Sequence, residues 1–308
     1  MKIALITINY NNAGATIKLL ETLRLNTDQD IMVVVVDNAS ELPDRAQLDT
    51  FIRSEYPETV LLASEKNLGF SGGNNVGMRY ASEQGTDWFI LINNDATVAP
   101  TFIADLKADL SGAEPGILAI PIQEGEHIAY GGQVLWLCST LPHLLERDLA
   151  NRRFYAIGAA MAVHRSVFDA MGPWDERYFL YFEDADLSER ARKRGWPISI
   201  AARAMIRHTP QTTTRELGAP LLLRYHIRNA LLFNFKHAPR WAVLMLPSWT
   251  FFVIVKQVFK LIVPLLIVPL RKRDQRDAAR AILHGIDDFY RGRFGIIHDD
   301  HRDRMRVH

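Results

Sequence analysis

Acidic side chains gather in two parts of the sequence where their spacing could support chemistry. Asp95 ends the polar run 93–95, directly after an apolar segment. A carboxylate on a short turn of this kind can hold a hard divalent cation that bridges phosphate oxygens. Asp184, with Glu183 and Asp186 beside it, follows a run of aromatic residues. Aromatic rings that partly exclude water raise the pKa of a carboxylate and make it a better base. The two clusters therefore predict a metal-binding carboxylate and a general base.

Other side chains near these acids have both a functional and a structural interpretation. Asp184 and Asp186 point to different sides of a helix, and Arg190 could pair with either, so at least one acid is expected to be structural. His208 taken alone is more often a surface or structural histidine than a ligand. Four aromatic residues fit a wall that stacks on a ligand and a place in the core equally well: Trp174, Tyr178, Phe179 and Tyr181.

Polar residues also follow the apolar segments of the N-terminal half. The runs 3–8, 31–36, 60–63 and 88–92 are predicted to be buried strands, with helical periodicity between them. This alternation over residues 1–120 predicts an α/β fold with an open, mostly parallel sheet that binds ligands at the carboxyl ends of its strands. The candidate ligand-binding residues at these ends are Thr7, Asn9 and Tyr10, then Asp37, then Asn67, Gly69, Gly72, Gly73 and Asn74, and finally Asn94 and Asp95.

The glycine-rich stretch after the third expected strand is predicted to be a loop. Its glycines would let the backbone approach a ligand closely. It contains neither the G-x-G-x-x-G dinucleotide fingerprint nor a Walker A sequence, so by itself it does not indicate which nucleotide, if any, is bound.

Beyond residue 120 the pattern weakens. Residues 121–155 are expected to be irregular or to form an antiparallel edge, and 154–163 is expected to be a strand. Residues 183–194 predict a helix whose acidic first turn and basic last turn suit the helix dipole.

The formal net charge of +1 conceals two oppositely charged parts. Residues 1–216 hold 20 Lys and Arg against 28 Asp and Glu, whereas residues 217–308 hold 16 against 7. We expect two domains with these bounds, the first made of two halves, about 1–120 and 121–216. The overall charge gives no indication of nucleic-acid binding. The single cysteine, Cys138, excludes an internal disulfide and indicates a reducing, cytoplasmic compartment.

A long apolar stretch at 241–270 differs from the rest of the chain. Lys256 and Lys260 divide it, prolines interrupt it, and the basic run 271–273 follows. A helix or hairpin in the membrane interface fits this pattern best, through about 241–273, at the inner face of the cell membrane. A packing or homodimer interface and a true membrane span are the alternatives.

Taken in order, these motifs resemble the inverting family 2 glycosyltransferases of GT-A fold, particularly the rhamnosyltransferase-like branch. The resemblance covers about residues 1–235 and rests on segments 7–11, 36–40, 67–77, 93–95, 158–161, 182–187 and 225–229. It implies that Asp37 and Asn9 contact the nucleotide, that Asn67 and the glycine–asparagine stretch line the donor pocket, and that Asp184 is the base, with Glu183 as fallback. Asp95 and His208 would hold Mg²⁺ or Mn²⁺, although Asn93 replaces the first acid of the family's Asp-x-Asp motif. Within the first domain, the resemblance implies a nucleotide-sugar half at about 1–120 and an acceptor half at about 121–216. The acceptor side would include Trp174, Tyr178, Tyr181 and Asp186.

The function implied is transfer of a sugar, rhamnose by preference, from a nucleoside-diphosphate sugar to a lipid-linked or cell-surface polysaccharide acceptor. A sugar nucleotidyltransferase is an alternative, but residues 7–16 hold one glycine and no Lys or Arg to form a basic phosphate loop. A catalytically inactive nucleotide-sugar-binding scaffold is the other alternative, because the first acid of the metal motif is missing.

Overall fold

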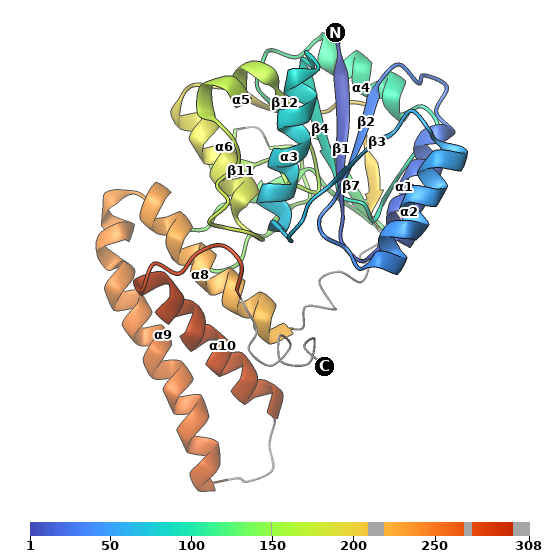
Figure 1. The fold of residues 1–308 in the computed structure, drawn as a ribbon. Helices are drawn as coiled ribbons and strands as arrows, with labels where there is room; N and C mark the ends of the chain where they lie inside the picture. The colour runs from blue at the N-terminus through green and yellow to red at the C-terminus, as the bar shows by residue number, and fades with distance from the viewer. Residues whose placement is uncertain (149, 209–218, 268–272, 298–308) are drawn as a thin grey trace. The chain divides into compact units, whose positions relative to one another are not determined.

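The computed structural model describes residues 1–148, 150–208, 219–267 and 273–297, which fall into two compact units (Figure 1). The sheet unit comprises Met1–Val134, Leu141–Glu176 and Glu183–Thr213. The helical unit comprises Leu135–Thr140, Arg177–Phe182 and Thr214–His308. The domain boundary expected between 216 and 217 lies outside the described residues. The sequence did not predict that segments 135–140 and 177–182 group with the C-terminal helices.

A seven-stranded sheet forms the middle of the sheet unit, in the order β13-β6-β12-β4-β1-β2-β3. Strands β4, β1, β2 and β3 are parallel neighbours, whereas β12 runs antiparallel to β4 and to β6. The predicted α/β fold with a parallel core is confirmed. The strands are β1 (Ile3–Asn9), β2 (Met32–Asp37), β3 (Val60–Ala63), β4 (Trp88–Ile92), β6 (Ile117–Ala119), β12 (Ala160–His164) and β13 (Ile198–Ile200).

Helices cover both faces of this sheet, which explains why its strands are continuously apolar. Alternate residues of β1 enter two separate apolar clusters. Leu5 belongs to the cluster that contains Leu20 and Leu106, and Ile6 belongs to the cluster that contains Met78. The helices are α1 (Ala13–Arg24), α2 (Leu42–Glu55), α3 (Gly69–Glu83), α4 (Phe102–Ser111), α5 (Arg165–Met171) and α6 (Glu183–Lys193), as Figure 1 shows.

The glycine-rich stretch expected to be a loop is the first half of helix α3, so that prediction was wrong. Two of its glycines, Gly73 and Gly77, serve packing against β1. A Cβ on Gly73 would lie 2.9 Å from the side chain of Ile8, and a Cβ on Gly77 would lie 2.4 Å from that of Ile6. Glycine is required because it lets the helix approach the sheet this closely.

Two small sheets complete the unit. One has the order β5-β14-β7-β8, and the other has the order β10-β9-β11. The strand expected over 154–163 is interrupted, because the Gly158 N–H donates to the Asp184 side chain and not to a strand ladder. The strands are β5 (Ala96–Val98), β7 (Ile122–Glu124), β8 (His127–Ala129), β9 (Gly131–Gln133), β10 (His143–Leu144), β11 (Phe154–Tyr155) and β14 (Ile206–His208).

The helical unit contains α8 (Ala219–His237), α9 (Arg240–Ile267) and α10 (Arg273–Tyr290). Arg224 of α8 makes a bidentate ion pair with Asp288 of α10, with N–O distances of 2.6 and 3.0 Å. Helix α9 is one element that continues past Pro247, so the proline does not divide the apolar stretch into a hairpin. Of the helices described, Arg240–Ile262 within α9 is long and apolar enough to cross a membrane, and 22% of its most apolar window is buried.

Segment 177–182 is held on α8 by two buried polar side chains. The Asn229 amide nitrogen lies 2.7–3.0 Å from the carbonyl oxygens of Tyr178, Leu180 and Tyr181. Arg228 donates to the Tyr178 carbonyl and to the Asn229 side-chain oxygen. Three non-glycine residues of this segment have positive φ angles, which L side chains rarely adopt: Phe179, Tyr181 and Phe182. The bonds from α8 therefore stabilise an unfavourable backbone conformation.

Candidate active site

The carboxyl ends of β1 and β2 meet through Asn9. Its register partner in the sheet is Asp37, and its side-chain nitrogen lies 3.0 Å from an Asp37 carboxylate oxygen. The same nitrogen lies 3.0 Å from the Ser40 hydroxyl and 2.8 Å from Asp44. The second Asp44 oxygen accepts the Ala13 N–H at the start of α1. The sequence interpretation missed Asp44, because its position on α2 gives no sign that it reaches β1 and α1.

The network extends to the other two strand ends. Thr16 donates to the Asn9 oxygen at 2.8 Å, and the Asn94 amide donates to Thr16 at 2.9 Å. Asn38 directly follows β2, and its amide donates to the side-chain oxygen of Asn67, which comes after β3, at 3.0 Å. We call Asn9, Thr16, Asp37, Asn38, Asn67 and Asn94 the strand-end network. The structure thus brings the ends of β1 to β4 together, as the parallel sheet requires.

Burial divides the predicted donor-site residues into two groups. Five are buried, including Asp37 at 0% exposure: Thr7, Asn9, Asp37, Gly73 and Asn74. The Asn74 amide donates a hydrogen bond to the Phe70 carbonyl of its own helix. Four are partly exposed and can touch a ligand directly: Tyr10, Asn67, Asn94 and Asp95.

Asp95 and His208 lie next to each other in the four-stranded sheet, where β5 begins and β14 ends. Asp95 directly precedes β5, and β5 pairs antiparallel with β14, which places His208 opposite Ala96. The His208 Nε2 atom lies 3.0 Å from an Asp95 carboxylate oxygen, and Nδ1 lies 2.9 Å from Glu124 Oε1. Burial lowers the pKa of His208, but the hydrogen bonds to the two carboxylates outweigh this effect, and the pKa is raised. The sequence interpretation missed Glu124, 84 residues away.

The chemistry of this pair fits a divalent cation. A carboxylate oxygen and an imidazole nitrogen that lie 3.0 Å apart could both coordinate one ion. Within the described ranges, no three or more His, Cys, Asp or Glu side chains gather as a metal site. Two protein ligands would therefore leave positions for diphosphate oxygens and water, as is usual for Mg²⁺ with nucleotides.

Asp184 lies in the first turn of α6 and is half-buried. One carboxylate oxygen accepts the Gly158 N–H at 2.9 Å, and the other accepts the Ala185 N–H at 2.7 Å. A Cβ on Gly158 would lie 3.3 Å from the Asp184 Cβ, so the glycine allows this approach. Burial raises the pKa of Asp184, and the backbone hydrogen bonds offset part of that increase. A raised pKa brings a carboxyl group closer to the range of a useful general base.

The neighbouring acids have different surroundings. Asp186 is 0% exposed and pairs with Arg190 at 2.8 Å, which marks it as the structural acid of the cluster. Glu183 is buried. An acceptor contact by Asp186 is therefore not available in this structure.

The predicted aromatic wall is not assembled within one unit. Trp174 belongs to the sheet unit, is 2% exposed and packs edge-to-face on Phe70. Tyr178 and Tyr181 belong to the helical unit. Tyr178 is buried, whereas Tyr181 is partly exposed and stacks on His226 with ring centroids 3.9 Å apart. Trp174 and Tyr178 therefore occupy core positions and present no free ring face for a sugar.

Known proteins share the sequence and the fold. The model of glycosyl transferase family 2 matches residues 4–172. N-acetylglucosaminyl-diphospho-decaprenol L-rhamnosyltransferase of Mycobacterium tuberculosis is 26% identical over 269 residues, which cover 77% of this chain and 85% of the relative. The dTDP-rhamnosyl transferase RfbF of Shigella flexneri is 22% identical over 227 residues, which cover 69% of this chain and 74% of the relative.

Solved structures agree with the fold. Mannosyltransferase PcManGT from Pyrobaculum calidifontis, in complex with GDP-Man and Mn²⁺, superposes with a TM-score of 0.57 at 13% identity, over 94% of this chain and 87% of that chain. Residues 1–349 of S. aureus TarS, in complex with UDP-GlcNAc, give 0.54 at 15% identity, over 95% and 92%. The architecture is that of the GT-A glycosyltransferases. The chain belongs to glycosyl transferase family 2, in its rhamnosyltransferase-like group, and is a glycosyltransferase.

Proposed function

We propose that this enzyme is an inverting glycosyltransferase that moves rhamnose from a nucleoside-diphosphate sugar to a lipid-linked or cell-surface polysaccharide acceptor. The observation that carries the proposal is the environment of Asp184, a half-buried carboxyl group with a raised pKa at the start of a helix. The choice of sugar and acceptor is supported by relatives named for rhamnose transfer, one of them to a diphospho-decaprenol lipid.

In the proposed reaction, Asp184 accepts the proton of an acceptor hydroxyl while that oxygen bonds to the anomeric carbon. The bond from this carbon to the diphosphate oxygen breaks with inversion, and the nucleoside diphosphate leaves with the bonding electron pair. A carboxylate suits this role, because the hydroxyl loses its proton only as the new bond forms.

Asp95 and His208 would hold a divalent cation, Mg²⁺ or Mn²⁺, whose charge would stabilise the departing diphosphate. The partly exposed members of the strand-end network, Asn67 and Asn94, would donate hydrogen bonds to the donor nucleotide or sugar, and their partial exposure supports this role. The buried members, Asn9 and Asp37, fix the positions of these strand ends.

The test is a screen of rhamnose and other hexose nucleotides for transfer to a polyprenyl-diphosphate-linked acetylated amino sugar, with Mg²⁺ or Mn²⁺ added. We expect a rhamnose donor to be used most efficiently, and Asp184→Asn to remove its transfer. Asp186→Asn is the matched control, because it removes a neighbouring carboxylate that pairs with Arg190, and the folded variant should still transfer the sugar. The assignment fails if Asp184→Asn transfers the sugar at the wild-type rate.

We also propose that α9 attaches the enzyme to the inner face of the cell membrane. One face of the helix packs inside the helical unit through residues such as Leu246, Thr250 and Gln257. The other face exposes apolar side chains along the helix: Trp241, Leu244, Met245, Phe251, Phe252, Val255, Val258, Phe259 and Ile262. A helix that is apolar and exposed on one side only is suited to lying in the membrane interface.

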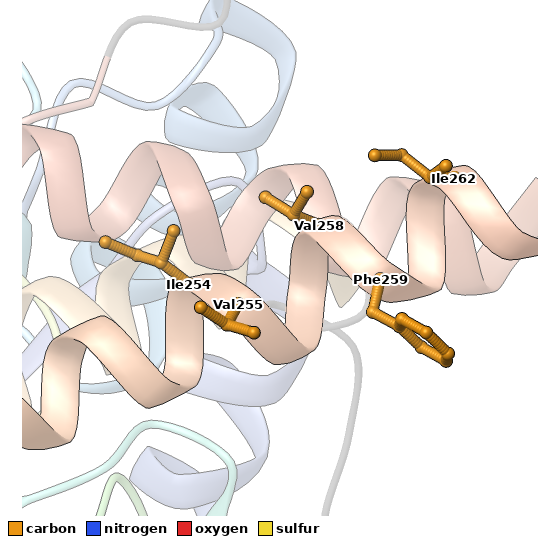
Figure 2. Close-up of a pocket in the computed structure, with 5 residues that line it drawn as sticks. All are labelled: Ile254, Val255, Val258, Phe259 and Ile262. Carbon is orange, nitrogen blue, oxygen red and sulfur yellow. The ribbon is translucent and has the colours of Figure 1, made fainter.

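The exposed side of α9 includes a shallow apolar groove lined by Ile254, Val255, Val258, Phe259 and Ile262, which Figure 2 shows along successive turns. Lys256 and Lys260 lie exposed on the same helix, where anionic headgroups would attract them. The basic run at 271–273 that the sequence interpretation included lies mostly outside the described residues.

Vesicle sedimentation tests this attachment. The full chain should bind phosphatidylglycerol-containing vesicles, and a variant with Phe252→Asp and Phe259→Asp should bind far less. Leu42→Asp, which changes an exposed apolar residue of the sheet unit, is the matched control and should bind like the wild type. If both aspartate variants bind equally well, or if the α9 variant only converts a dimer to a monomer, membrane attachment through α9 is wrong.

A further inference from the structure

His208 lies between two carboxylates that come from the two strands beside its own. Strand β14 is hydrogen-bonded to β5 on one side and to β7 on the other. Asp95 directly precedes β5 and contacts Nε2, whereas Glu124 ends β7 and contacts Nδ1. The two acids therefore contact opposite nitrogens of one ring.

The two nitrogens of a neutral imidazole have different roles, since one carries a proton and the other a lone pair. Asp95 and Glu124 are both acceptors when ionised, so they compete for the single proton of the neutral ring. A divalent cation held by Asp95 would take the lone pair of Nε2 and leave that proton on Nδ1, where Glu124 at 2.9 Å accepts it. The same bond limits rotation of the ring about its Cβ–Cγ bond.

We propose that Glu124 is a positioning residue that orients His208 and fixes its tautomer, so that Nε2 binds the divalent cation together with Asp95. This inference rests on the metal site of the proposed function. Acceptors on the outer nitrogen of a metal-bound histidine commonly tune metal affinity in this way. The alternative is that Glu124 only fastens β7 to β14, in which case its loss would lower stability and leave metal binding unchanged.

Direct binding of Mn²⁺ separates these roles without relying on activity. The full chain is titrated with Mn²⁺ alone, and free Mn²⁺ is followed by its electron paramagnetic resonance signal. Electron spin echo modulation then reports whether an imidazole nitrogen is bound. We expect Glu124→Met to weaken Mn²⁺ binding roughly 10–100-fold and to reduce the nitrogen signal.

Glu124→Gln keeps an oxygen that accepts the Nδ1 proton, so it should bind Mn²⁺ more tightly than Glu124→Met. The control is Glu126→Ala, which removes an exposed carboxylate two residues along the chain and should bind Mn²⁺ like the wild type. Thermal unfolding of each variant shows whether it is folded. If Glu124→Met does not fold, Glu124→Ala takes its place in the comparison.

The inference is overturned if the Met or Ala variant binds Mn²⁺ within twofold of the wild type with the same nitrogen signal, or if the Gln variant is no better than they are. Asp95→Ala and His208→Ala test the metal site itself. If these two variants also bind Mn²⁺ normally, the proposed metal site is wrong. If they lose binding and the Glu124 variants do not, only the role of Glu124 is wrong.

Discussion

The two units use buried polar groups in different ways. In the sheet unit, the strand-end network consists of side chains that bond to one another, and one of its partly exposed members, Asn94, directly precedes Asp95. In the helical unit, Arg228 and Asn229 bond to main-chain carbonyl oxygens and hold segment 177–182 in an unusual conformation. The comparison indicates that polar side chains of the sheet unit hold one another at the strand ends, whereas those of the helical unit fix the backbone.

The largest expected effect separates catalysis from stability within the sheet unit. Asp184→Asn should reduce transfer roughly 10²–10⁴-fold, because the variant cannot accept the acceptor proton. The unfolding temperature at neutral pH should change little, because the loss of one backbone acceptor opposes the gain from removing a buried charge. Asp186→Asn should instead destabilise the enzyme by about 3 kcal/mol, since it breaks a buried ion pair with Arg190. Transfer assays and urea unfolding measure the two effects, and a reversed pattern would exchange the roles of the two acids.

A second prediction concerns the pH dependence of Asp184. Burial raises its pKa, so transfer should fall about tenfold per pH unit once the pH drops below that value. The contribution of Asp184 to stability depends on pH in the opposite direction to transfer. A raised folded-state pKa favours the protonated form, so this contribution is present below the unfolded-state pKa and is lost as pH rises through the folded-state pKa. Asp184→Asn removes the buried charge but also one of the two oxygens that accept the Gly158 and Ala185 N–H groups, so its stability at neutral pH should be close to that of the wild type. A rate of transfer that does not fall at low pH would contradict the raised pKa.

The sequence predicted the parts of the site that depend on strand ends. Short apolar runs located β1, β2 and β4, and a parallel sheet must bring Asn9, Asp37 and Asn94 to one edge. The pairing of Asp95 with His208 came from the family resemblance and not from their spacing, since 113 residues separate them. Glu124 and Asp44 escaped prediction because their partners come from distant elements, and a lone acid on a strand or helix has many simpler explanations.

Helix α3 shows a different limit. Glycine and asparagine disfavour helices in isolation, so residues 69–77 resemble a loop by propensity. Close packing of Gly73 and Gly77 on β1 overrides that preference, and this contact is invisible until the sheet has been placed. Segment 177–182 was missed for a similar reason, because its conformation depends on side chains of α8.

A third prediction tests the backbone-fixing role of the helical unit. Arg228→Met should remove bonds to the carbonyls of Tyr178 and Gly295 and destabilise the protein by about 2–4 kcal/mol. Arg240→Met, on an exposed residue, is the control for loss of one positive charge. Urea unfolding gives the free energies. Equal stability of the two variants would mean that the bonds from Arg228 do not hold the segment.

The smallest effect compares ion pairs of similar chemistry in the two units. Arg24 and Glu55 of the sheet unit are 2.6 Å apart, but both side chains are about half exposed at 48%. Water solvates both groups well, so Arg24→Gln should destabilise the protein by less than about 1 kcal/mol, and less in high salt.

Asp288 of the helical unit is 2% exposed, and Arg224→Gln would leave its buried charge with fewer donors. We therefore expect the Arg224 variant to lose several times more stability, with little change on adding salt. Urea unfolding at two salt concentrations measures both variants. Similar losses would show that burial does not set the strength of these pairs, and the contrast between the two units would then have to rest on Asp184 and Arg228 alone.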